Sequence, residues 1–384
     1  MRFPVNLTGL AMRMMNVVST ISLLQDMGIL PLGMACNTCS SALGPYATNH
    51  NYHYFECSSC KTKTSILSHT VLSNSNTKLR EFVILMYLFC TNHRTYNTVR
   101  KEAHVEIEGY KDVHLSSSTI NKWFGYFRRL CVEDNKRFPM KIGGVGDIVE
   151  IDESMCGKLK YGKGDGRKRR RQWIFGGLSR TSGRLFMTPC PDNKRTRKSL
   201  WPIIQANIAE GTTIHSDGWR CYRRLGELNY NHRWINHDLH YVDPTDPSLH
   251  TNGVEGLWGK FKRWLPSSGK YNLEEYMELF MWLERKKLEK EDPFWALVEL
   301  VKADNSTETL KKSMERMGDV EDTEGVEYVG EEEVLLEKQA QEDLGEDSDE
   351  EDLEKFYFYD CVFCKSIFRN NTDLVSHIGK CRNK

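Results

Sequence analysis

The sequence lacks any apolar run long enough to cross a membrane, since a spanning helix needs roughly 20 consecutive apolar residues and no segment approaches that length. The apolar N-terminus, residues 1–31, is where a targeting peptide would be considered first. Asp26 and the absence of a clean small-residue cleavage site argue against one. We therefore expect residues 1–35 to form a helical segment that packs on the neighbouring cysteine-rich region, and we expect no membrane partner.

The chain also lacks net charge, but this balance conceals two opposite parts. It contains 53 basic and 53 acidic residues among 384. Residues 319–354 hold 18 acids and one base, Lys338, so they carry −17 and the remainder carries +17. A basic body with an acidic tail indicates a nucleic-acid partner for the body rather than a small-molecule substrate. The tail has too few apolar residues to fold alone, so we expect residues 303–356 to be a disordered acidic linker.

A disulfide framework is missing as well. Seven of the 12 cysteines fall in two clusters with metal-ligand spacing, and the other five are scattered, which fits a reducing compartment. The first cluster reads Cys36-x2-Cys39-x17-Cys57-x2-Cys60. Two such knuckles close a tetrahedral four-cysteine zinc site, so residues 36–62 are predicted to form a zinc ribbon with a structural or DNA-contacting role.

The second cluster lies at the C-terminus and reads Cys361-x2-Cys364-x12-His377-x3-Cys381. This spacing is that of a ββα zinc finger in which the last histidine is replaced by cysteine. We expect a finger at residues 357–384. The spacing leaves open whether it contacts DNA or protein.

Residues 63–140 are predicted to be helical. In the second half of this region, apolar residues recur at helical spacing after a Ser/Thr cluster suited to an N-cap near Ser118. The apolar stripe comprises Ile120, Trp123, Phe124, Phe127 and Leu130. Lys122 and Arg128 lie away from it and are candidate DNA contacts. The pattern fits a helix-turn-helix whose last helix enters the major groove and fits equally an ordinary bundle with a solvated basic face.

The pattern changes at residue 146 to alternating strands and helices. Strands are predicted at residues 148–152, 173–179, 184–190 and 212–217, and helices at 195–209 and 273–290. The order predicts an α/β domain with a mixed sheet flanked by helices, spanning residues 146–290.

Three carboxylates stand at or near the ends of predicted elements here: Asp152, Asp217 and Glu255. Mg²⁺ takes oxygen ligands, and two such ions about 4 Å apart can clamp the attacking and leaving oxygens of a phosphoryl displacement. The two-residue period of a strand puts Glu150 on the face of Asp152 and turns Glu153 away. Each acid has a plainer reading. Asp152 can be a lone surface acid, which fits poorly with so apolar a strand. Asp217 can cap a helix over residues 219–228, and Glu255 can be a solvated helix acid.

Basic residues flank these acids. The densest segment, residues 158–171, holds eight bases opposed by one acid, a composition that neutralises phosphates and also suits nuclear import. The candidate DNA contacts in it are Lys158, Lys160, Arg167, Lys168, Arg169, Arg170 and Arg171. A second basic edge follows Glu255 and comprises Lys260, Lys262 and Arg263.

Several ordered blocks carry a family resemblance: VEIDES at 149–154, IHSDGW at 214–219 and HTNGVEGLWGKFKRW at 250–264. Together they resemble the catalytic domain of Merlin-class DDE transposases and of related bacterial insertion-sequence transposases, over roughly residues 146–290. The resemblance implies an RNase H-like fold, cut-and-paste DNA transposition and Asp152, Asp217 and Glu255 as the catalytic acids holding two Mg²⁺ or Mn²⁺ ions. Double-stranded DNA with terminal inverted repeats is then the expected partner, bound by a homodimer or larger synaptic oligomer.

The acidic linker and the finger stand outside this resemblance. We therefore expect a nuclear DDE-type transposase that cleaves and transfers DNA strands, with a host-retained, transposase-derived DNA-binding or chromatin protein as the alternative. A third possibility, an RNase H-like nuclease acting on RNA or branched DNA, shares the acids but has no need of so many DNA-binding modules. Fold alone does not choose among them.

Overall fold

The structure is a computed structural model of the chain. It describes residues 5–43, 45–49, 52–73, 75–91, 96–103, 115–137, 141–156, 172–235, 246–266, 272–305, 359–360 and 367–368. The basic segment 158–171, most of the linker and all four ligands of the predicted finger lie outside the described residues. The chain divides into two units, Met1–Val326 and Glu327–Lys384. In the second, β9 (Tyr359–Asp360) and β10 (Ile367–Phe368) pair in antiparallel fashion.

The N-terminal segment contains two short helices, α1 (Leu7–Arg13) and α2 (Val17–Asp26). Each begins at an asparagine, Asn6 or Asn16, whose side chain accepts a backbone N–H of the first turn. Among the described residues no single helix is long and apolar enough to span a membrane, although α1 and α2 pass that test when taken together across a 114° bend. Their buried residues, Leu10 and Ile21 among them, belong to an apolar core shared with the helices further along the chain.

The predicted zinc ribbon carries a three-stranded antiparallel sheet. Its strands are β1 (Tyr46–Asn49), β2 (Tyr52–Glu56) and β3 (Lys63–Ser65), in that order. The helices after the ribbon are α3 (Leu79–Cys90), α4 (Tyr96–Ala103) and α5 (Ser117–Lys136). The apolar stripe predicted for α5 is buried, but its N-cap is Ser116 rather than Ser118, because the Ser116 hydroxyl accepts the Thr119 N–H at 3.0 Å.

The helical core draws on both ends of the described unit. Besides α1 to α5 it includes residues of α8 (Leu273–Leu288) and α9 (Pro293–Asp304). Tyr126 of α5 donates to Asp304 at 2.7 Å. With neighbours on several sides, α3 is buried almost all round instead of along one stripe. Helices that follow the α/β domain in sequence therefore complete the core that precedes it.

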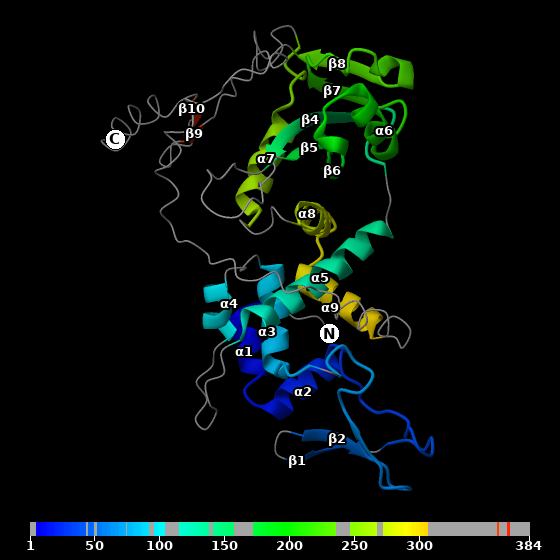
Figure 1. The fold of residues 1–384 in the computed structure, drawn as a ribbon, viewed down its shortest axis with the longest axis vertical. Helices are drawn as coiled ribbons and strands as arrows, with labels where there is room; N and C mark the ends of the chain where they lie inside the picture. Colours follow the sequence, from blue (N-terminus) through cyan, green and yellow to red (C-terminus); the bar gives the residue numbers. More distant parts are fainter. Residues whose placement is uncertain are drawn as a thin grey trace, which may run out of the picture. The chain divides into compact units, whose positions relative to one another are not determined.

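The α/β domain is built on one mixed five-stranded sheet, as the sequence predicts. Its strands are β4 (Ile148–Cys156), β5 (Gln172–Ser179), β6 (Leu185–Pro189), β7 (Thr213–Asp217) and β8 (Asn231–Ile235). The order is β6-β5-β4-β7-β8 (Figure 1). Strands β4, β5 and β6 are antiparallel neighbours, whereas β7 and β8 run parallel to β4. The edge strand β8 is absent from the sequence prediction.

Separate apolar clusters cover the two faces of this sheet. One includes α6 (Arg197–Asn207) and the other includes α7 (Asn252–Trp264) and part of α8. Gly176 of β5 permits this second contact, since a Cβ there would lie 2.8 Å from the Trp258 ring. The prediction of a helix over residues 219–228 is wrong: this segment forms turns and a short 3₁₀ helix, Leu225–Leu228, which ends at Asn229 in the left-handed conformation.

Candidate metal centre

Three carboxylates meet beside the adjacent parallel strands β4 and β7, two of them from the middle of β4 and one from the carboxyl end of β7. One oxygen each of Asp152, Glu153 and Asp217 lies within 4.8 Å of the others. The strand register explains the meeting, because Glu150 of β4 pairs with His215 of β7, so the residues two places further on also lie level. We call these three residues the acid group. It contains two of the three predicted catalytic acids.

Glu153 is the member that sequence reasoning missed. The prediction that it turns away from the site is wrong, because one of its carboxylate oxygens lies within 4.8 Å of those of Asp152 and Asp217. Burial, and then the charge of Asp217, raise the pKa of Glu153 to about 7, while Tyr222 and Arg195 oppose that rise. Its Oε1 is buried without a hydrogen-bond partner in the part of the chain that is described. The available signal was a second acid beside Asp152 in an apolar strand.

Such a group of acids fits a hard divalent cation. A buried carboxylate without a donor is stabilised either by a proton or by a positive ion. Oxygen ligands from two strands are what Mg²⁺ and Mn²⁺ accept. Residues Asp152, Glu153 and Asp217 are therefore the ones that would hold such an ion.

Hydrogen bonds orient both aspartates of the group. Trp258 Nε1 on α7 donates to Asp152 Oδ2 at 3.0 Å. The Trp219 backbone N–H donates to Asp217 Oδ1 at 3.0 Å, a local capping contact that survives although the helix expected there does not form.

Glu255, the third predicted acid, lies in the first turn of α7 and is not part of the acid group. Its Oε1 accepts a hydrogen bond from the Thr251 hydroxyl at 2.9 Å. The structure thus brings Asp152 and Asp217 together and leaves the Glu255 carboxylate bonded within its own helix start. The catalytic assignment of all three stays a prediction.

A buried ion pair fixes the beginning of α7. Glu150 is 2% exposed and accepts from Arg180 Nε at 2.6 Å and from the Val254 N–H at 2.9 Å. Arg180 also donates to the backbone oxygens of Ser248 and His250, at 2.6 and 2.9 Å. As predicted, Glu150 shares the face of Asp152, and both contact α7. Its role in the structure is to position that helix.

The four cysteines of the N-terminal cluster form a second metal-type site. Their sulfurs lie within 4.8 Å of one another, with Cys39 Sγ 3.4 Å from Cys57 Sγ. The two knuckles match, since Ser40 and Lys61 close them with φ values of 58° and 60°. The backbone N–H groups of Cys39 and Thr38 lower the pKa of Cys36, which favours the thiolate that binds metal. The set of donors fits zinc.

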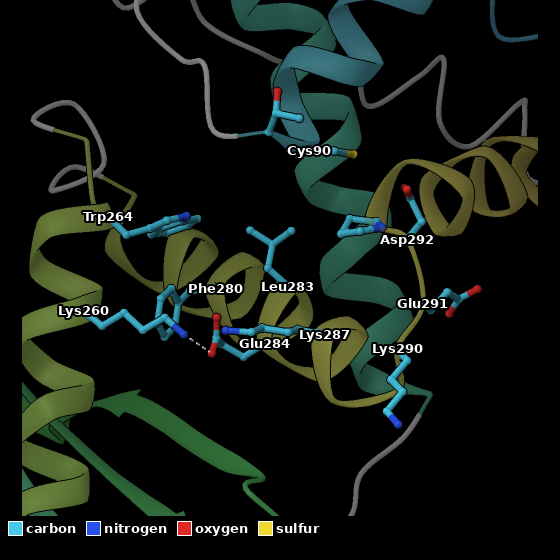
Figure 2. A pocket seen from close by; sticks show the side chains of 12 residues that line it. Cys90, Lys260, Trp264, Phe280, Leu283, Glu284, Lys287, Lys290, Glu291 and Asp292 are labelled. Atoms are coloured by element: carbon cyan, nitrogen blue, oxygen red, sulfur yellow. Dashed lines mark hydrogen bonds and ion pairs between the residues drawn. The ribbon is translucent and has the colours of Figure 1, made fainter. Parts of the chain in front are cut away.

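The described candidates for DNA contact differ in what they touch. Lys122, Lys262 and Arg263 are exposed. Arg128 is 13% exposed and lies 3.2 Å from Glu275 Oε2, against α8. Lys260 pairs with Glu284 at the edge of a pocket of about 580 Å³ (Figure 2).

That pocket carries mixed charge. Its lining includes Lys287 and Lys290 but also Glu284, Glu291 and Asp292. Such balance does not attract a polyanion. We take Arg128 and Lys260 to stabilise helix packing in this structure, and their proposed contact with DNA remains a prediction.

Comparison with known proteins bears on the α/β domain. Residues 144–284 match the ISXO2-like transposase domain. This match takes in the acid group and Glu255, and it covers well under half of the chain. The chain thus contains a transposase-type domain. The matching model is of the insertion-sequence kind, so it supports that part of the resemblance and does not extend to the Merlin class or the C-terminal finger.

Two individual proteins are also similar. An uncharacterized transposase-like protein of Haemophilus influenzae is 28% identical over 85 residues, which are 22% of this chain and 64% of that protein. The chain therefore spans less than two thirds of that relative. The crystal structure of the Mos1 strand transfer complex is 14% identical with a TM-score of 0.23, covering 58% of this chain and 69% of that one. A TM-score this low carries no argument here.

Proposed function

We propose that the chain is a DDE-type DNA transposase that cleaves and transfers strands at terminal inverted repeats, with an RNase H-like catalytic domain of the Merlin class. The observation that carries the proposal is the acid group, which lies within a segment that matches a transposase domain. The sheet order β6-β5-β4-β7-β8, antiparallel on one side of β4 and parallel on the other, is consistent with that fold.

The chemistry assigned to the site follows from its donors. Two Mg²⁺ or Mn²⁺ ions would supply Lewis-acid activation of the attacking oxygen and neutralise charge on the leaving oxygen. Asp152, Asp217 and Glu255 are the proposed catalytic acids, and we add Glu153 as a fourth candidate ligand. Trp258 and the Trp219 N–H hold the aspartates in fixed orientations. A carboxylate so oriented loses little freedom when it binds.

The remaining parts of the chain are assigned to DNA and zinc. Four cysteines hold one structural zinc ion, and the C-terminal finger holds another. The basic segment 158–171 and the exposed bases of α5 and α7 bind double-stranded DNA. The chain does so in the nucleus, as a homodimer or larger assembly. Chelation should unfold the ribbon, because so small a unit depends on its metal. By metal analysis we expect one zinc ion in each ribbon. We expect the Cys57→Ser variant to lose this ion.

Strand cleavage tests the proposal directly. Full-length protein is incubated with DNA carrying the element's terminal repeats, with Mg²⁺ or Mn²⁺ or without any added divalent metal. We expect nicking that requires the metal and disappears in Asp152→Asn and Asp217→Asn. Glu227→Gln, a change in an exposed ion pair of the 3₁₀ turn, is the matched control. Cleavage by Asp152→Asn at the wild-type rate would refute the proposal.

Two further variants identify the third ligand. Loss of cleavage in Glu255→Gln but not in Glu153→Gln assigns the role to Glu255, and the reverse result assigns it to Glu153.

The placement of Glu255 favours a second candidate function. A third acid bonded to Thr251 rather than to the acid group is what a host-retained DNA-binding protein without transposition would display. Tight, salt-dependent DNA binding without cleavage under any metal condition would establish this alternative.

A further inference from the structure

A short basic stretch borders the acid group and is not among the predicted DNA contacts. Residues 194–198, at the end of the connection from β6 and in the first turn of α6, include four bases: Lys194, Arg195, Arg197 and Lys198. Lys194 and Lys198 are exposed, and the two arginines are half-buried. Arg195 is the member held in a defined position.

Two indole rings enclose the Arg195 guanidinium. Its Cζ lies 3.7 Å from the centroid of the Trp173 ring and 4.9 Å from that of Trp219. Both tryptophans are themselves anchored: Asn193 Oδ1 accepts the Trp173 N–H at 2.6 Å, and the Arg195 carbonyl accepts Trp219 Nε1 at 3.3 Å. A guanidinium between two aromatic faces is fixed in its plane, which directs its N–H groups outward from the edges of the stack.

This arrangement leaves the donors of the guanidinium without a protein acceptor. Among the described residues its side chain makes no hydrogen bond and no ion pair, even though three carboxylates lie nearby. Trp219 connects the two features, because its ring stacks on Arg195 while its backbone N–H binds Asp217.

The described residues that flank the basic segment lie side by side. Cys156 and Gln172, the described residues next to its two ends, are paired between β4 and β5. Gln172 directly precedes Trp173. The stacked arginine and the points from which the densest basic segment departs are thus neighbours.

We propose that Arg195 binds a backbone phosphate of the nucleic-acid strand next to the phosphate placed at the acid group. A planar guanidinium presents paired donors that match two phosphate oxygens. The inference rests on the proposed function for its substrate class. This contact would fix the position of the strand relative to Asp152 and Asp217.

The test measures DNA binding without added Mg²⁺ or Mn²⁺, so that it does not depend on cleavage and leaves the zinc sites loaded. Full-length wild type, Arg195→Gln and Arg224→Gln are titrated against a fluorescent duplex of mixed sequence at several KCl concentrations. Arg195→Gln keeps a planar group between the indoles but removes the charge. We expect several-fold weaker binding and a slope of log Kd against log salt that is smaller by about one. Arg224, exposed and paired with Glu227, should leave both unchanged.

A measurement on the wild type covers the case in which Arg195→Gln fails to fold. Phenylglyoxal modifies accessible arginines, and peptide mass spectrometry locates them. We expect the duplex to protect Arg195 and to leave Arg224 reactive. Equal modification of Arg195 with and without DNA, or a wild-type slope and Kd in folded Arg195→Gln, overturns the inference.

These outcomes are separable from those of the cleavage assay. Arg195-dependent binding without any cleavage sinks the transposase proposal and leaves the phosphate contact standing. Metal-dependent cleavage together with DNA binding that is unchanged in Arg195→Gln would support the transposase proposal and refute the phosphate contact.

Discussion

Replacing Glu150 by glutamine should destabilise the protein far more than the same change in an exposed ion pair. The Glu150 carboxylate accepts two donors, Arg180 Nε at 2.6 Å and the Val254 N–H at 2.9 Å, and is 2% exposed. A glutamine offers one oxygen and one NH₂, so one of the two donors would face another donor. Losing a hydrogen bond to a charged group and leaving Arg180 unpaired costs about 2–4 kcal/mol. Because the Arg180 side chain is 22% exposed, the expected loss of stability is smaller than for a fully buried ion pair.

Glu227→Gln provides the matched comparison. Glu227 also contacts the Nε of an arginine, Arg224, but the two side chains are 49% and 59% exposed. Exposed pairs contribute about 0–1 kcal/mol. Both variants are unfolded in urea while tryptophan fluorescence is recorded, and the midpoints are compared with wild type at equal protein concentration.

The reasoning fails if the two midpoints shift equally. It also fails if Glu150→Gln has a higher urea midpoint than wild type, because the cost of burying the charge would then exceed the stability gained by pairing it. Arg180→Met together with Glu150→Met distinguishes the two effects. If desolvation dominates, the double variant will be at least as stable as wild type.

Three further predictions rest on other contacts. A Cβ at Gly176 would lie 2.6 Å from a backbone oxygen. Gly176→Ala should therefore lower the free energy of unfolding by about 1–3 kcal/mol in a urea titration. Gly226→Ala, which has open space around it, should leave that free energy unchanged. Burial lowers the pKa of His215 to about 4. The contribution of His215 to the free energy of unfolding should therefore be fully present above about pH 6.5 and fall by up to about 3 kcal/mol as the pH drops toward 4. His215→Gln should remove this part of the pH dependence and keep the part due to His232, whose pKa burial also lowers to about 4. Thr251→Val removes the hydroxyl that binds Glu255; if that acid is a metal ligand, calorimetry should show about five-fold tighter Mn²⁺ binding, and unchanged affinity would contradict the role.

The sequence predicts those parts of the fold that local patterns determine. Alternation and apolar runs locate β4 to β7, and helical spacing identifies the buried face of α5, including Trp123 and Phe127. Matched cysteine spacing brings four sulfurs within bonding distance of a single ion. In each case the signal lies within one element or one pair of knuckles.

The misses arise where partners far along the chain decide the outcome. Helix α3 shares its apolar core with residues of α9, far along the chain, and is buried almost all round. Cys221, Tyr222 and Leu225 are all buried. A helix with one apolar face has the same spacing, so the pattern alone does not distinguish that helix from the turns that form. Period two turns Glu153 to the other face of β4, but it does not show that the long side chain brings its carboxylate within 4.8 Å of those of Asp152 and Asp217.

The position of Glu255 depends on contacts that lie outside its own turn. Helix α7 is held at Val254 by Glu150 and at Trp258 by Asp152, one residue before and three residues after Glu255. A helix held at both points cannot slide along the sheet without breaking a buried pair. Any approach of the Glu255 carboxylate to the acid group must therefore come from rotation of its side chain after it leaves Thr251. The Glu150–Arg180 pair thus sets the distance that this rotation has to cover. This is a physical reason for keeping a costly buried charge at a site where geometry matters more than stability.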